Sequence, residues 1–322
     1  MSITDDIRAT CAAVAREARF VRIDESRIDG YARSLPLSEL RQPSIHPDRH
    51  YLGRGEATAA FFVTLDAINF GSGYFPHLRK RPGMSGYFTI ASCLTDHFSR
   101  HGPMGAEQLA RVTPDDCARI FEQPTPDDAI SELLTLFARA LNDLGQYLLD
   151  QFDGSFTRLI ESAHHSALQL IGLLAQMPLF NDVQRYRGGR EVPFYKRAQL
   201  TAADLSLALG GEGLGRFDDL DQLTIFADNL VPHVLRIDGI LRYEPDLAAR
   251  IDREELIPAG SEEEVELRAG AVHASELIVR ALNGAGHTSV TAMNVDYILW
   301  HRGQNPAYKQ AKPRHRTRTT FY

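Results

Sequence analysis

The amino-acid sequence predicts an all-α, or mainly α, fold with few short strands, in a single compact domain over residues 1–322. Apolar residues recur at helical spacing along much of the chain, helix start signals precede several of these segments, and the alternating patterns of strands are few. Hydrophobic residues make up 43% of the 322 positions and charged residues 24%, an ordinary globular composition that allows a sizeable core. No repeat or low-complexity linker interrupts the pattern.

Two apolar segments predict the clearest helices. Between Asp127 and Leu149 the apolar residues follow steps of three and four, which places them on one stripe of an amphipathic helix. Residues 163–177, AHHSALQLIGLLAQM, are apolar nearly all round. Such a helix is normally buried in the centre of an α domain, so we expect that position for it.

Three helix starts are indicated by side chains that can accept hydrogen bonds from the N–H groups of a first turn. They stand at Thr113 before Pro114, at Thr201 with Asp204, and at Ser261 with Glu264, where SEEE has capping-box spacing. The glycine-rich segment GGEGLG (210–215) lies between SLALGG and FDDLDQLTIFAD (217–228), which predicts a helix, a glycine hairpin and a second helix. Residues 189–196 are the best candidate for a short extended piece, whereas 36–56 and the tail 302–322 look irregular.

Charge and cysteine content narrow the class of protein. The net charge of −7 argues against a protein that mainly grips long nucleic acid, because such proteins usually carry a basic surface. Cys11, Cys93 and Cys117 are odd in number and form no CxxC motif, which is typical of free thiols in a reducing cytosol. The acidic N-terminus resembles no signal peptide, and no apolar run is long enough for a membrane span, so we expect a cytoplasmic protein without a membrane partner.

The tail 302–322 differs from this acidic background. It contains six lysine and arginine residues, no acid and three aromatic residues. Charge alone is equally consistent with a disordered tail, but the aromatic residues give this segment something to pack with. We therefore expect a basic strap over an anionic ligand, since arginine binds phosphate strongly through paired hydrogen bonds.

A single acid, Asp228, stands in the apolar segment TIFADNLVPHVLR (224–236), which we expect to be helical. Such an acid can face solvent, pair with a buried cation or take part in chemistry, and spacing alone leaves these alternatives open. Pro232 would open the helix near Asp228 by freeing a carbonyl group. Lys196, among apolar neighbours before the glycine hairpin, is a candidate cation.

The histidine pairs of the sequence favour no metal site. His46 and His50 have a spacing that some metal sites use, but HPDRH lacks the further ligands of such a motif. On a helix the adjacent His164 and His165 would point about 100° apart and could not share a ligand. We expect neither a metal nor any other cofactor.

Six collinear motifs resemble those of the queuosine salvage proteins, the queuosine 5′-phosphate N-glycosylase/hydrolases. They are HYLGRGEAT with LDAINF (50–58, 65–70), KRAQL (196–200), FADNLVPHVLR (226–236), PAGSEEEVELRA (258–269), VDYILW (295–300) and PRHRTRTTFY (313–322). The resemblance runs from about residue 46 to the C-terminus, and the KRAQ, FAD and GSxxEVELRA blocks are each fairly specific.

The resemblance implies a fold similar to that of the helix-hairpin-helix DNA glycosylases. It also implies hydrolysis of the N-glycosidic bond of queuosine 5′-monophosphate. The products are ribose 5-phosphate and the base queuine, which is salvaged into tRNA. It implies that Asp228 is the catalytic carboxylate, that Lys196 shares the catalytic site, and that the tail binds the 5′-phosphate. The substrate-binding positions that it implies are His50, Phe226, Asp296, Tyr297 and His301, and the phosphate-binding positions are Lys312, Arg314, His315 and Arg316. His301 departs from the family, which often has an acid there, so its contact with the base differs.

This chemistry suits the residue types. Cleavage of an N-riboside builds positive charge on the sugar, and a carboxylate below the ribose can stabilise that charge, attack it or activate water. Queuine is a 7-deaza base and lacks the N7 that purine hydrolases protonate, so charge stabilisation at the sugar carries more of the barrier. Phe226 could stack a flat base, and Asp296 could accept two N–H donors from a guanine-like edge.

Two other functions fit parts of the pattern: a glycosylase acting on a base within tRNA or DNA, and a non-catalytic binding protein for a modified base. The acidic balance and the short basic segment favour one phosphate over many, so we expect a small-molecule nucleotide as partner and no polymeric nucleic acid. Binding of a polymer would weaken steeply with salt, and turnover separates an enzyme from a binding protein. The sequence leaves the oligomeric state open.

Overall fold

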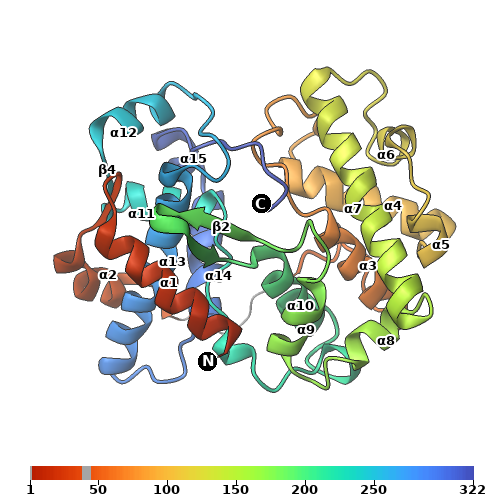
Figure 1. The fold of residues 1–322 in the computed structure, drawn as a ribbon, viewed down its shortest axis with the longest axis horizontal. Helices are drawn as coiled ribbons and strands as arrows, with labels where there is room; N and C mark the ends of the chain where they lie inside the picture. The colour runs from red at the N-terminus through yellow and green to blue at the C-terminus, as the bar shows by residue number, and fades with distance from the viewer. Residues whose placement is uncertain (1, 38–44) are drawn as a thin grey trace. The chain divides into compact units, whose positions relative to one another are not determined.

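A computed structural model describes residues 2–37 and 45–322, and helices dominate it (Figure 1). The prediction of a mainly α fold is confirmed. The chain divides into two compact units, each assembled from segments that are far apart in the sequence. Unit 1 comprises residues 2–37, 182–196 and 221–318, and unit 2 comprises residues 45–181, 197–220 and 319–322. The single domain with a strap from residue 302 stays a prediction.

Unit 1 contains helices and two small antiparallel sheets. Its helices are α1 (Ile3–Glu17), α2 (Ile28–Ser34), α11 (Leu230–Ile237), α12 (Pro245–Asp252), α13 (Glu262–Gly284), α14 (Ala292–Gln304) and α15 (Pro306–Ala311), with short 3₁₀ turns at Glu25–Arg27 and Arg187–Gly189. In one sheet β1 (Val21–Ile23) pairs with β4 (Leu241–Tyr243), and in the other β2 (Val183–Tyr186) pairs with β3 (Arg190–Pro193). The extended segment predicted at 189–196 is therefore confirmed over β3.

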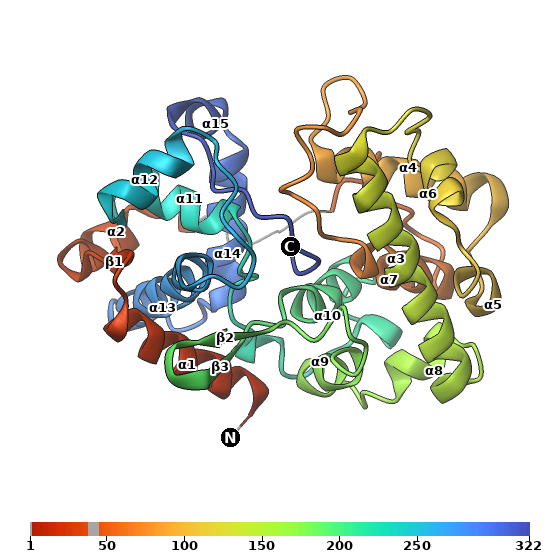
Figure 2. The same cartoon turned by 45° about the horizontal axis from the view of Figure 1, so that its top comes forward.

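Helix α13 is the centre of unit 1. It contacts α1, α2, α11, α14 and strands of both sheets, so most of its circumference is buried. Figure 2 shows it enclosed by these elements. Small residues allow the close packing: a Cβ atom on Gly270 would lie 3.2 Å from Cγ1 of Val21. Ser261 caps the helix as predicted, accepting a hydrogen bond from the Glu264 N–H at 3.2 Å.

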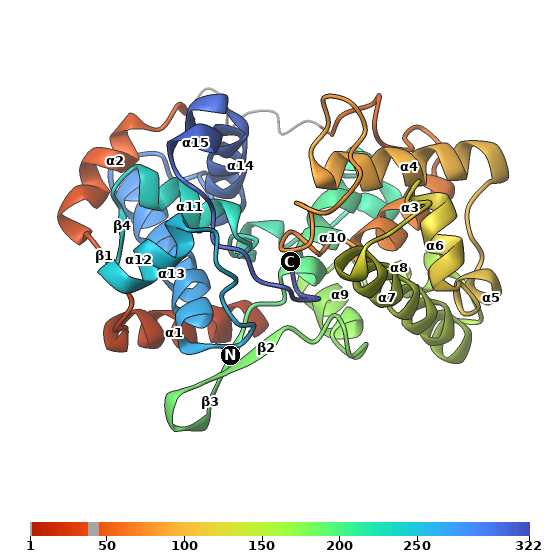
Figure 3. The same ribbon diagram turned by 90° about the horizontal axis from the view of Figure 1, so that it is seen from above.

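Glu266, on α13, is a buried carboxylate that fixes the entry to β1. Its exposed fraction is 1%, and it accepts hydrogen bonds from three consecutive backbone N–H groups, those of Arg19, Phe20 and Val21. The Tyr186 hydroxyl, on β2, donates to it at 2.7 Å. Figure 3 shows the β2–β3 ribbon, which packs against α1 and α13. One side chain thus joins three elements of unit 1.

Unit 2 is helical around a long central helix, α7 (Asp128–Phe152). Its other helices are α3 (Glu56–Ala67), α4 (Gly86–His101), α5 (Ala106–Leu109), α6 (Pro114–Ile120), α8 (Phe156–Glu161), α9 (Ala167–Leu174) and most of α10 (Lys196–Ala208), with a 3₁₀ turn at Gly213–Gly215. The stripe predicted between Asp127 and Leu149 is confirmed, because its apolar side chains are buried. Thr113 caps α6 with a full capping box, also as predicted.

The prediction of a long buried helix at 163–177 is wrong in two respects. The helix, α9, spans only Ala167–Leu174, and it exposes Gln169 and Gly172. His164 and His165 precede it in a turn, with positive φ angles of 49° and 62°, so the helical geometry assumed for them does not apply. Ser166 starts the helix by accepting from the Gln169 N–H, a capping signal that the apolar pattern concealed.

Two predictions around the glycine segment are also wrong. Thr201 lies inside α10, which already begins at Lys196, so it is not a cap. The second helix expected over 217–228 is replaced by a 3₁₀ turn at Leu220–Gln222 and by residues 223–227, which form neither helix nor strand. Residues 223–227 are all buried, so the apolar pattern there reports burial and not a helix.

The tail is more regular than predicted. Residues 302–304 complete α14, and α15 continues to Ala311 because Asn305 caps it and Pro306 occupies its first turn. Only residues 312–322 run as an irregular strap. Within the stretch 36–56, residues 38–44 lie outside the described residues, and residues 45–55 form turns, as predicted.

The structure also bears on the predictions for the cysteines and for membrane spans. Cys11, Cys93 and Cys117 are free, buried thiols, as expected. Over residues 2–37 and 45–322, no helix has the length and apolar character that a bilayer span requires.

We expect Glu266→Gln to lower the free energy of unfolding by about 1–3 kcal/mol, because the glutamine amide turns donors toward backbone N–H groups that need an acceptor. Urea unfolding followed by circular dichroism measures this loss. The exposed Glu132→Gln change on α7 is the control and should have little effect. Equal stability of the Glu266→Gln variant and the wild type would contradict the anchoring role of Glu266.

Candidate active site

Asp228 lies directly before α11, and not within a helix as the sequence suggested. Its Oδ1 accepts hydrogen bonds from the N–H groups of Leu230 at 2.7 Å and Val231 at 3.1 Å, the first residues of the helix. Pro232 in this first turn cannot donate to the Asp228 carbonyl, so the helix does not extend backward. Among the described residues none donates to the second oxygen, Oδ2, and the side chain is only partly buried. Asp228 thus has one fixed oxygen and one available for chemistry.

Asp296, on α14, is a second acid in the same region of unit 1. It is 4% exposed, and its Oδ1 accepts the Phe226 N–H at 2.9 Å. Burial raises the pKa of Asp296 well above its ordinary value, and the nearby Asp228 carboxylate raises it further, whereas the Phe226 N–H and the Lys196 ammonium act in the opposite direction. Asp296 therefore retains its proton to higher pH than an exposed aspartate.

Lys196 is positioned by the open end of the β2–β3 ribbon. Its side chain is 6% exposed and interacts electrostatically with Asp296. The preceding residue, Tyr195, has a φ angle of 46°, a left-handed conformation that costs a non-glycine residue on the order of 1 kcal/mol. The fold therefore holds strained backbone next to this lysine.

The aromatic residues of the predicted base site pack on one another. The Phe226 ring is 4% exposed and meets Tyr297 edge to face, with ring centroids 6.3 Å apart. His301, one turn after Tyr297, is exposed, and its Nδ1 is 2.7 Å from the Tyr297 carbonyl oxygen. Because a carbonyl only accepts, Nδ1 of His301 carries the proton, and Nε2 can accept a further hydrogen bond.

The four predicted phosphate residues have different surroundings. Arg314 has an exposed side chain. Desolvation by the surrounding protein lowers its pKa and the Asp228 carboxylate acts in the opposite direction, but a guanidinium stays charged. Lys312 pairs with Asp252 at 3.0 Å, and Arg316 pairs with Glu254. His315 is 2% exposed, and burial lowers its pKa to about 3, so it is neutral at pH 7.

The strap is fixed to the segment that carries Asp228. The Asn229 side chain donates to the His315 carbonyl at 3.3 Å, and the Arg316 carbonyl accepts the Ile257 N–H at 2.8 Å. These two bonds place Arg314 beside the start of α11.

His50, predicted to contact substrate, belongs to unit 2. It is 5% exposed, stacks on Phe62 and has hydrogen bonds on both ring nitrogens. Nδ1 lies 2.9 Å from the His46 carbonyl oxygen and Nε2 lies 3.1 Å from the Tyr87 hydroxyl, so Nδ1 carries the proton. Burial lowers the pKa of His50, which keeps it neutral at pH 7.

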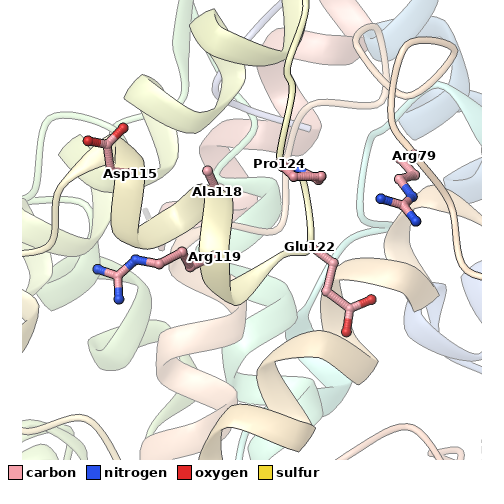
Figure 4. A pocket seen from close by; sticks show the side chains of 6 residues that line it. All are labelled: Arg79, Asp115, Ala118, Arg119, Glu122 and Pro124. Carbon is pink, nitrogen blue, oxygen red and sulfur yellow. The ribbon is translucent and has the colours of Figure 1, made fainter.

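An open depression of about 630 Å³ lies elsewhere on unit 2, between the residues labelled in Figure 4. It is lined by Arg79, Asp115, Ala118, Arg119, Glu122 and Pro124. Glu122 is already engaged by Arg81, and Arg119 by Asp116. The lining includes none of the predicted site residues and offers mixed, largely neutralised charge, so we place the candidate site around Asp228.

Three residues of this region, Asp182, Asn229 and Arg268, are not among those predicted from the sequence. Arg268 is fully buried and binds both oxygens of Asp182, while its Nε donates to the carbonyl of Ala227, directly before Asp228. An arginine within the apolar helix ELRAGAV was a detectable signal, since a buried arginine requires partners. Asp182 follows a turn and has no pattern that would reveal its role.

These features define a class of protein: a mainly helical protein whose candidate site contains a helix-capping carboxylate, a second buried acid and two cations. Residues 46–322 match the family described as queuosine salvage protein. The chain is 39% identical to a queuosine 5′-phosphate N-glycosylase/hydrolase of Sphaerobacter thermophilus, over 98% of this chain and 97% of that protein. Proteins of the same name from Dictyostelium discoideum (35% identity, 83% of this chain and 79% of that protein) and Bos taurus (29%, 98% of each) are also similar. The chain belongs to the queuosine salvage protein family.

The raised pKa of Asp296 predicts a specific dependence of stability on pH. Native Asp296 holds its proton at pH values where the unfolded chain, with a pKa of about 3.9, has lost it. The wild type therefore loses stability as the pH rises from the ordinary carboxyl pKa toward the native one, by about 1.4 kcal/mol for each pH unit in that window. Asp296→Asn, which has no proton to lose, should gain stability relative to the wild type between pH 4.5 and 7.5. Urea unfolding at both pH values measures the difference, and a constant difference would mean that Asp296 is ionised in the native state.

Proposed function

We propose that this protein hydrolyses the N-glycosidic bond of queuosine 5′-monophosphate, releasing queuine and ribose 5-phosphate so that the base can be salvaged for tRNA. Membership of the queuosine salvage family and relatives named queuosine 5′-phosphate N-glycosylase/hydrolase support this reaction. The observation that carries it in the structure is Asp228, with Oδ1 fixed by the start of α11 and Oδ2 left for the sugar.

In the proposed reaction the bond between C1′ and the base nitrogen breaks, and its electron pair leaves with the base. Positive charge develops on C1′ and the ring oxygen, as in other glycoside hydrolyses. The Asp228 carboxylate stabilises that charge in place, because its orientation is already set by the Leu230 and Val231 N–H groups. Water then supplies hydroxide to C1′ and a proton to the base, which balances the reaction.

Asp296 and Lys196 complete the proposed charge arrangement. A protonated Asp296 leaves a single negative charge near the sugar, whereas two carboxylates side by side would repel each other. It also provides one O–H donor for a polar edge of the base. Lys196, which interacts electrostatically with Asp296, adds one positive charge to this arrangement.

For the 5′-phosphate we favour Arg314 among the tail residues. It is the tail cation that interacts with Asp228, and it is exposed to solvent. Lys312 and Arg316 are paired with acids, and the buried, neutral His315 anchors the strap through its carbonyl group. A guanidinium binds a phosphate through two parallel hydrogen bonds. In this proposal the substrate carries one phosphate and is not a nucleic acid polymer.

Asp228→Asn should retain nucleotide binding and lose turnover by on the order of 10²–10³-fold or more, because the charge that stabilises the sugar cation is removed. Asparagine still caps α11, so folding is preserved. Chromatography of released queuine measures turnover, and calorimetry measures binding. Asp127→Asn, the corresponding change at the cap of α7 in unit 2, is the matched control and should keep full activity. Comparable turnover by Asp228→Asn and the wild type would exclude Asp228 as the catalytic carboxylate.

Arg314→Gln should raise KM for queuosine 5′-monophosphate by about 10- to 100-fold, since a charge-assisted hydrogen bond is worth about 1.5–3 kcal/mol. KM for the nucleoside queuosine, which has no phosphate, should change little. Lys312→Gln is the control, because this exposed residue is paired with Asp252 and should leave both values within about threefold. An equal rise of KM for nucleotide and nucleoside would remove Arg314 from the phosphate site.

A further inference from the structure

A fully buried arginine connects the two residues to which we assign the chemistry. Arg268 projects from the central helix α13 and donates to both oxygens of Asp182, at 3.0 and 2.5 Å. Its Nε donates to the carbonyl oxygen of Ala227 at 3.0 Å. The next residue is Asp228, so Arg268 fixes the peptide that leads into the catalytic carboxylate.

Asp182 extends this connection to Lys196. It stands at the open end of the β2–β3 ribbon, where its backbone carbonyl accepts the Phe194 N–H at 2.9 Å and the Tyr195 N–H at 3.4 Å. Its Oδ2, which also binds Arg268, accepts the backbone N–H of Lys196 at 3.3 Å. Asp182 therefore holds the turn in which Tyr195 adopts its left-handed conformation and from which Lys196 emerges.

A contribution to stability does not by itself explain the buried ion pair of Arg268 and Asp182. Replacing a buried ion pair by apolar residues of similar volume is often neutral or stabilising, because desolvation offsets the attraction. The neighbourhood could accept apolar groups, since the Phe194 ring lies 4.0 Å from the guanidinium carbon. What an apolar pair could not do is bind the Ala227 carbonyl and the Lys196 N–H at once.

We propose that Arg268 is a positioning residue for the glycosidase, which through Asp182 and Ala227 sets the relative geometry of Lys196 and Asp228. The inference rests on the proposed function. Arg268 itself contacts neither reacting atoms nor phosphate in this proposal, so it acts through the two residues that it places. A displacement of about 1 Å at such a site can cost on the order of 10²-fold in rate.

Arg268→Lys tests the proposal, because lysine keeps the charge but cannot bind two Asp182 oxygens and the Ala227 carbonyl in one plane. We expect kcat for queuosine 5′-monophosphate to fall on the order of 10²-fold. KM should stay within about threefold, since the phosphate contact assigned to Arg314 is unchanged. Both constants are measured by chromatography of released queuine, at a temperature where circular dichroism shows each variant folded.

Glu266→Gln is the matched control. Glu266 lies on α13 two residues before Arg268 and is equally buried, but its partners are Arg19, Phe20, Val21, Tyr186 and Arg187. We expect it to lower the melting temperature without changing kcat more than about twofold. A similar fall of kcat in both variants, or an unchanged kcat in Arg268→Lys, would show that Arg268 serves stability alone and would overturn the proposal.

Asp182→Asn is the second variant, and it decides the question if Arg268→Lys does not fold. It retains the shape of the side chain and its backbone carbonyl but weakens the bond to the guanidinium, so kcat should fall at a nearly constant KM. Full activity of this variant overturns the proposal. Failure of the proposed function is recognised separately, because the wild-type protein would then release no queuine at all.

Discussion

The arrangement of unit 1 depends on two charged side chains of α13 that are buried. Glu266 and Arg268 stand on the most enclosed helix of the unit, where neither can reach water, so each must be met by fixed partners. Glu266 is met by three N–H groups that lead into β1, and Arg268 by Asp182 and the Ala227 carbonyl. The entry to β1, Asp182 and Ala227, which are distant in sequence, are thereby all bound to α13. Asp228, which follows Ala227, acquires a defined position.

In the candidate site, too, the surroundings of charged groups are set by fixed partners. Two acids, Asp228 and Asp296, lie near each other, and the structure gives them unlike surroundings. Asp228 accepts two backbone N–H groups at the start of α11, whereas Asp296 is buried and its pKa is raised by that burial. In the proposed reaction these unlike surroundings let Asp228 stabilise charge at the sugar and Asp296 donate a hydrogen bond.

The sequence was informative wherever local signals agreed with tertiary context. The stripe of α7, the caps at Thr113 and Ser261 and the mainly α class were all predictable, because periodicity and capping act within a few residues. The absence of a helix at residues 223–227 was not, since a short buried apolar run is equally consistent with a buried helix. Family motifs pointed to Asp228, but the raised pKa of Asp296 and the bond between Asp182 and Arg268 depend on contacts across more than 40 residues.

In the proposed reaction Asp228 both caps α11 and stabilises charge at the sugar, which affects how the protein can evolve. Most replacements at this position remove the cap of α11 together with the chemistry, so an inactive descendant would also fold less well. Asparagine is the exception, because it caps a helix as well as aspartate does. A non-hydrolysing binder of the same nucleotide is therefore one nucleobase change away, since aspartate and asparagine codons differ only in their first letter.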